Sequence, residues 1–125
     1  MGRVVQRVDP VQLAGVLAPH ARAAIAFDRD GAVEALPVLY RRRGEEHLVG
    51  VARDALPEPA SFARAVLVLD DGSYWFELRA VTWRGRIDPA PADPADAAGE
   101  LVWLAFVPTG AIAWDYGTLH QDPDA

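Results

Sequence analysis

The sequence contains no cysteine and no lysine, and it has no apolar run long enough for a membrane-spanning helix. Without cysteine, neither a disulfide framework nor a thiolate metal site can form. Without lysine, Schiff-base catalysis is excluded, and a bound anion must be held by arginine or backbone amides. The histidines His20, His47 and His120 lack metal-ligand spacing, so no metal site is predicted. We expect a cytoplasmic protein with no membrane partner.

The charges are unevenly distributed along the chain. All twelve basic residues are arginines within residues 1–86, whereas residues 87–125 carry only acidic charges, and the net charge is −6. This balance argues against nucleic-acid binding. The 51% hydrophobic content is typical of a packed globule, and the length suits a single domain spanning residues 1–125.

The order of apolar runs and turn signals predicts a mainly β fold. A short helix is expected over 9–18, because Asp9 can cap it and Pro10 suits its first turn. The acidic, proline-rich stretch 88–100 is predicted to be a surface loop. Strands are expected between and after these segments, with the last one broken at "PTG". Because an open sheet would leave its edges exposed, we expect a small antiparallel Greek-key β-barrel.

The stretch "SYWFELRAVTWRGRI", residues 73–87, is apolar on both of its alternating faces. This pattern predicts a long strand with one face inside a barrel and the other against a second subunit. The alternation fixes which residues share a face and leaves the direction open. We place Phe76, Leu78 and Ala80 inside, and Trp75, Glu77, Arg79 and Trp83 toward the second subunit.

The order of these pieces resembles the pyridoxamine 5'-phosphate oxidase-like proteins with the FMN-binding split-barrel fold. The segments that carry the resemblance are the short helix, "ARAAIAFDRDGAVEALPVLY", "HLVGVA", the long hairpin and the closing "GAIAWDYGTLH". It implies a small antiparallel split β-barrel that forms a homodimer and binds FMN or a deazaflavin at the subunit interface. It also implies a flavin-dependent oxidoreductase.

The resemblance indicates which residues would hold the flavin. Arg53, after the third strand, is the first candidate for the phosphate, and the cluster Arg41, Arg42 and Arg43 is the second. Two readings of Pro37 are open: an ordinary edge strand, or a strand split that exposes backbone around Val38 to a flat ring. The remaining candidates are Tyr40, where the family has a strand-closing lysine, and Trp114, which could stack on the ring.

Two alternative functions follow from the same residues. Family oxidases hold the phosphate with an arginine and a lysine flanking the second strand, but "EALPVLY" has Glu34 and Tyr40 near these positions. The first alternative is therefore a cofactor-free dimeric barrel that binds a small ligand or another protein. The second is a haem-binding relative with His20, His47 or His120 as axial ligand.

Overall fold

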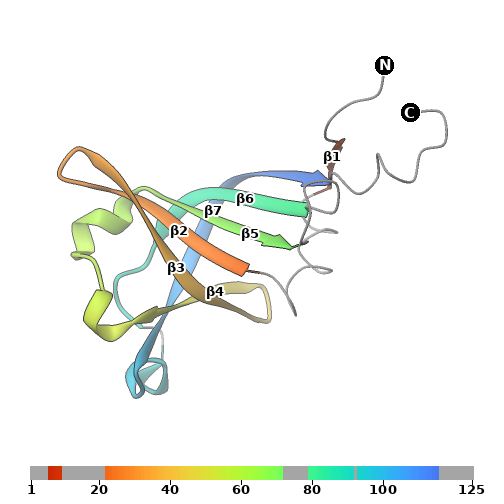
Figure 1. Ribbon diagram of the computed structural model, residues 1–125. Coiled ribbons are helices and arrows are strands. Elements are labelled where there is room, and N and C mark those ends of the chain that lie inside the picture. The colour runs from red at the N-terminus through yellow and green to blue at the C-terminus, as the bar shows by residue number, and fades with distance from the viewer. Residues whose placement is uncertain (1–5, 10–21, 72–78, 92, 116–125) are drawn as a thin grey trace, which may run out of the picture.

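The computed structural model describes residues 6–9, 22–71, 79–91 and 93–115, and most of these lie in seven β-strands (Figure 1). The predicted helix over 9–18 lies outside the described residues, apart from Asp9. The strands are β1 Gln6–Val8, β2 Arg22–Arg29, β3 Ala32–Arg43, β4 Glu46–Ala52, β5 Ala65–Asp71, β6 Arg79–Ile87 and β7 Leu101–Asp115.

Six of the strands form a closed antiparallel barrel, as the sequence predicted. The order around the barrel is β7-β4-β3-β2-β5-β6, and the pairing of β6 with β7 closes it. Strands β2, β3 and β4 follow one another through short turns, whereas β5 returns to pair with β2, which is a Greek-key connection. Strand β1 pairs with the end of β7, outside the closed ring.

The β2–β3 hairpin is fixed by its turn residues. Asp30 and Gly31 both have positive φ angles, of 53° and 84°. Two such residues in succession make the tight turn that matches the twist of an antiparallel pair. The carboxylate of Asp28 accepts a 2.9 Å hydrogen bond from the Gly31 amide and holds this turn in place.

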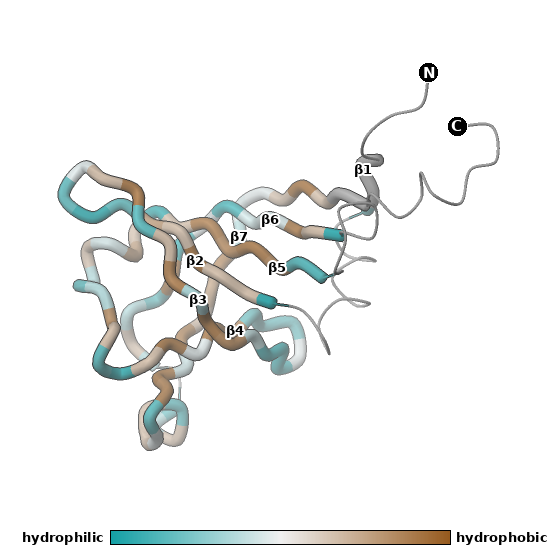
Figure 2. The backbone as a smooth tube through the Cα atoms, in the orientation of Figure 1, coloured by the Kyte–Doolittle hydropathy of each residue, from teal (hydrophilic) through white to brown (hydrophobic). Residues whose placement is uncertain are grey.

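The barrel interior is filled by alternate residues of all six strands. The largest fully buried side chains of this core include Ile25, Leu67, Leu69, Ile87 and Leu104. In Figure 2 the hydrophobic colour is concentrated along the strands, and the hydrophilic colour is concentrated at the hairpin turns and strand ends. Phe62, from the connection between β4 and β5, also enters the core and packs edge-on against Phe27.

The predicted side-chain directions in the long strand are wrong for Trp83, which was placed toward a second subunit, and for Ala80, which was placed inside. The side chain of Trp83 is only 5% exposed and belongs to the barrel core together with Val81, whereas Ala80 and Thr82 face outward and are half-buried. Alternation allowed both directions, and the register of β6 against β5 selects this one, since it pairs Trp83 with the buried Leu67. Residues 74–78 of the predicted strand lie outside the described residues.

The predicted break at "PTG" in the last strand is also wrong. Strand β7 runs without interruption to Asp115, and a β-bulge absorbs the irregularity. Arg84 pairs with Gly110 and Gly85 pairs with Pro108, so Thr109 is the extra residue. The Thr109 hydroxyl donates a 3.1 Å hydrogen bond to the Arg84 carbonyl across the bulge.

Two irregular connections complete the described structure. The crossing from β4 to β5 contains the 3-10 turns η1 Arg53–Ala55 and η2 Pro59–Ala63. The connection from β6 to β7 contains the 3-10 turn η4 Pro94–Ala97, capped by the Asp93 side chain, and projects at the bottom of the view in Figure 1. Within the described residues, no helix has the length and apolarity to span a membrane.

Candidate functional site

The outer face of β3 carries a row of exposed apolar side chains. Val33 is 82% exposed and Leu39 56% exposed, and Ala35 and Pro37 between them are also exposed. These residues alternate along the strand and so share one face. Strand β4 pairs with β3 only from Leu39 onward, which leaves the first half of β3 as an edge. We call this set the β3 row.

The structure decides between the two readings of Pro37. The strand is not interrupted there, because Pro37 pairs with Ala24 in an unbroken register with β2. Pro37 instead occupies an edge, where a missing N–H is tolerated. Ala24 and Ala26 extend the apolar surface of the β3 row across β2, and Val66 continues it on β5.

Two of the predicted site residues lie on the opposite face of β3. Val38 is buried in the barrel core, and Tyr40 is partly buried against it. Their side chains therefore do not share the surface of Pro37. The alternation of the strand already places Val38 and Tyr40 on the face opposite the β3 row. The sequence did not show which of these two faces pointed into the barrel.

Arg41 and Arg43 converge on one carboxylate outside the barrel. Asp96 is 5% exposed, and its oxygens lie 3.1 and 3.2 Å from Nη1 of Arg43 and 3.6 Å from Nη2 of Arg41. The Arg41 guanidinium also lies over the Trp103 ring, with Cζ 4.4 Å from its centroid. Arg43 makes a second ion pair, of 3.1 Å, with Glu46.

Arg53 reaches the same connection by a different route. Its guanidinium donates to the backbone carbonyls of Ala97 and Gly99, and its amide donates to the carbonyl of Glu100. Three arginines predicted as phosphate ligands are therefore held by residues 96–100. The sequence did not reveal this arrangement, because Arg53 and Gly99 are distant in the chain.

The remaining predicted residues lie elsewhere. Arg42 alternates with Arg41 and Arg43 on β3 and has no ion-pair partner among the described residues. The backbone of Trp114 pairs with Arg7 of β1 and Ala80 of β6, and its side chain lies outside what the structure describes.

Tyr40, His47 and Trp83 form an aromatic cluster partly inside the barrel. The Tyr40 hydroxyl and Nδ1 of His47 share a 2.6 Å hydrogen bond, and the His47 ring centroid lies 4.7 Å from that of Trp83. Burial raises the pKa of Tyr40 to about 12 despite the opposing charge of Arg42. Burial, assisted by Arg42, lowers the pKa of His47. The cluster keeps both groups neutral at physiological pH.

This cluster bears on the haem alternative. Nδ1 of His47 already has a hydrogen-bond partner, and the ring packs against both Tyr40 and Trp83. His47 is therefore built into the barrel packing. The other two histidines, His20 and His120, lie outside the described residues.

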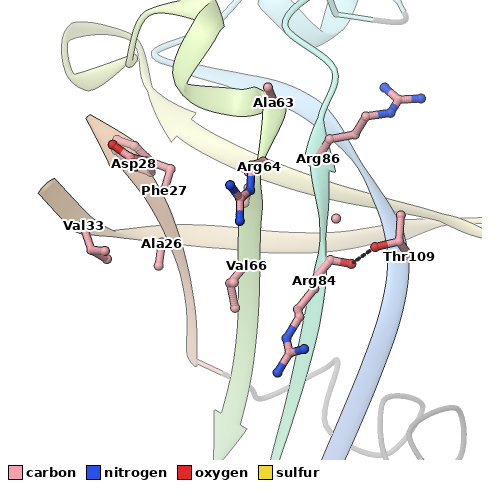
Figure 3. Close-up of a pocket in the computed structure, with 12 residues that line it drawn as sticks. Ala26, Phe27, Asp28, Val33, Ala63, Arg64, Val66, Arg84, Arg86 and Thr109 are labelled. Atoms are coloured by element: carbon pink, nitrogen blue, oxygen red, sulfur yellow. Dashed lines mark hydrogen bonds between the residues drawn. The ribbon is translucent and has the colours of Figure 1, made fainter. Parts of the chain in front are cut away.

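A cleft on the outer face of β2, β5 and β6 was not predicted (Figure 3). Its volume is about 540 Å³, and three arginines line it: Arg64, Arg84 and Arg86. Alternation showed that Arg84 and Arg86 share one face of their strand. That Arg64 joins them follows only from the register of β5 against β6, which the sequence did not provide. We call this site the arginine cleft.

No protein-family model matches the chain, and no curated protein matches its sequence. Solved structures do resemble it. An FAD-binding protein from Mycobacterium smegmatis is 15% identical with a TM-score of 0.66, covering 88% of this chain and 96% of the other. An FAD-binding protein from Mesorhizobium loti is 12% identical with a TM-score of 0.67, covering 90% and 98%.

A third similar structure is a proposed pyridoxamine 5'-phosphate oxidase from Corynebacterium glutamicum. It is 12% identical with a TM-score of 0.68, covering 88% of this chain and 96% of the other. At such identities the likeness shows the fold. The chain has the split-barrel fold of these proteins, and the resemblance predicted from the order of its segments is confirmed at this level.

Proposed function

We propose that this chain binds a flavin nucleotide against the outer face of β3, with FMN as the first choice and a deazaflavin as the second. The observation that carries the proposal is the β3 row, an exposed apolar strip on a sheet edge. A flat isoalloxazine ring would cover such a strip and remove it from water. Two of the similar structures are FAD-binding proteins, which supports the flavin class.

The arginines near the Leu39 end of the β3 row could bind the phosphate of a flavin nucleotide. Arg41 alternates with Leu39 on the same face of β3, and Arg43 and Arg53 meet the same 96–100 segment. Guanidinium groups bind phosphate through paired hydrogen bonds. Asp96 would compete for Arg41 and Arg43. A bound flavin supplies hydride or electron transfer, and the protein contributes position and charge.

The same surface supports a homodimer. The row and its neighbour Ala24 present apolar side chains across two adjacent strands. A second copy of the chain would cover the part of this face that the flavin leaves exposed. A two-fold interface uses the same patch on both subunits, and contact between two copies of this apolar patch would remove both from water.

Titration of purified protein with FMN, followed by quenching of flavin fluorescence, tests the proposal. FAD and a deazaflavin nucleotide serve as competitors. Leu39→Glu should weaken FMN binding on the order of tenfold or more, because a carboxylate would be desolvated beneath the ring. Ala90→Glu adds the same charge at an exposed position in the 88–100 segment and should leave the affinity unchanged. Equal losses in both variants, or no binding by the wild type, would contradict the proposal.

The phosphate position has its own test. Arg53→Ala should weaken FMN binding on the order of tenfold, as expected for a lost charge-assisted hydrogen bond. Asp96→Asn should strengthen it, because the substitution removes the competing negative charge from Arg41 and Arg43. Unchanged affinity in both variants would remove this cluster from the flavin site.

A second candidate function is a dimeric interaction barrel without a cofactor. The observation that favours it is the neutralisation of Arg41 and Arg43 by the buried Asp96 carboxylate. A protein that dimerises but binds none of the three flavins would establish this alternative over the first.

A further inference from the structure

We infer that the arginine cleft is a second binding site, for a small anionic molecule that also has an apolar part, such as a phosphorylated or carboxylated aromatic compound. The inference goes beyond the proposed flavin function. The cleft reaches β3 only at Val33, near the hairpin, whereas the arginines proposed for the flavin phosphate begin at Arg41, toward the other end of that strand.

The first argument is charge. None of the three guanidinium groups has an ion-pair partner among the described residues, whereas Arg22, Arg29, Arg41, Arg43 and Arg79 all do. The carboxylate that lines the cleft belongs to Asp28, which is engaged in the hairpin turn. An anion bound in the cleft would be attracted by these unpaired charges.

The register explains why these arginines line the same cleft. Ala65 of β5 pairs with Gly85 of β6, so Arg64 and Arg86 flank this pair on the other face of the sheet. Val66 pairs directly with Arg84. Figure 3 shows Arg84 and Arg86 extending in opposite directions along β6, with Arg64 beside Val66 on the neighbouring strand.

A β-bulge in the pairing of β6 with β7 fixes the position of β6 between Arg84 and Arg86. A Cβ atom on Gly85 would lie 2.0 Å from the Val107 carbonyl oxygen, so the close approach of β7 requires glycine. On the other side of the bulge, the Thr109 hydroxyl holds the Arg84 carbonyl. Bulges often position side chains beside binding sites. Here the bulge lies between the two arginines of β6.

The floor of the cleft determines the class of ligand. Ala26 and Val66 are neighbours in the β2–β5 register, and Ala63 and Val33 extend the apolar lining. A volume of about 540 Å³ lies in the range of small-molecule sites. An apolar floor beside unpaired guanidinium groups suits an aromatic phosphate better than a bare inorganic ion.

The experiment uses phenyl phosphate and inorganic phosphate as probes in calorimetric titrations of the full chain. Phenyl phosphate should saturate one site per chain and bind more tightly than inorganic phosphate. Arg84→Ala and Arg64→Ala should each weaken phenyl phosphate binding by about tenfold or more. Arg22→Ala, which removes an exposed arginine outside the cleft, should not.

The controls separate this site from the flavin site. Leu39→Glu should leave phenyl phosphate binding intact even where it abolishes flavin binding, and circular dichroism should show that each variant retains its strands. Absence of saturable binding would overturn the inference. Equal losses in Arg22→Ala and Arg84→Ala would do the same, because the effect would then be one of net charge. Equal affinity for the two probes would refute the role of the apolar floor.

Discussion

The hydroxyl of Tyr40 and Nδ1 of His47 lie 2.6 Å apart, from adjacent strands β3 and β4, and both rings contact Trp83 from the opposite wall of the barrel. The hydrogen bond satisfies two polar groups that the fold removes in part from water. Such pairs stabilise a fold mainly because breaking them leaves an unpaired group behind.

Tyr40→Phe should lower the free energy of unfolding by about 1–2 kcal/mol, because the imidazole nitrogen loses its partner. Urea denaturation at neutral pH measures the change. Because burial raises the pKa of Tyr40 to about 12, its stabilising contribution is present below pH 10 and is lost as the pH rises through 12. A 295 nm absorbance titration should show a late tyrosinate step that Tyr40→Phe removes. An unchanged titration would contradict the buried phenol.

His47 should contribute to acid sensitivity. Its pKa is lowered below the ordinary value of 6.5 by burial and by Arg42, so the folded state favours the neutral ring. The contribution is present above pH 6.5 and is lost as the pH falls through the lowered pKa. His47→Gln should therefore lose less stability than the wild type between neutral and mildly acidic pH. Parallel stability curves would show that His47 titrates normally.

Gly85→Ala should destabilise the protein by about 3 kcal/mol, because the added methyl group would meet the backbone of β7 rather than a movable side chain. Gly110→Ala is the matched control on the paired strand. No atom lies within 4 Å of a Cβ built at Gly110, so its melting temperature should hardly change. Similar melting temperatures for the two variants would mean that β7 does not approach β6 closely at Gly85.

Trp83→Ala should cost about 3–5 kcal/mol, the usual range for removing a large aromatic side chain from a core. Trp103→Ala is the comparison. Trp103 lies outside the core, covers Gly50 and is only partly buried, so its loss should cost less. Thermal unfolding of both variants measures the difference. Equal costs would place Trp83 at a surface.

The proposed dimer predicts an association that depends on the β3 row. Wild-type protein should scatter light as a dimer at micromolar concentration, and Leu39→Glu should shift it toward the monomer while the fold is retained. The reason is that an interface would desolvate the new carboxylate. Ala90→Glu should stay dimeric. A monomeric wild type at high concentration would remove the shared interface.

Much of the barrel could be predicted from local pattern. The Asp30–Gly31 turn sets the β2–β3 hairpin, and the alternation of β5 sets its buried face. The resemblance in segment order led to the correct fold. Because strand period is a local property, the sequence also determined which residues share a face, including Pro37 with Leu39 and Arg84 with Arg86.

Tertiary structure decided which face turned inward and which distant groups met. The register of β6 placed Trp83 in the core, although its alternation was equally consistent with an interface. The return of the 88–100 connection brought Asp96 to Arg41 and Arg43, and the β5–β6 pairing placed Arg64 in the same cleft as Arg84 and Arg86. The alternation of side chains along a strand depends only on neighbouring residues. Which residues of two strands lie side by side depends on barrel closure, because closing the ring fixes all the strand registers together.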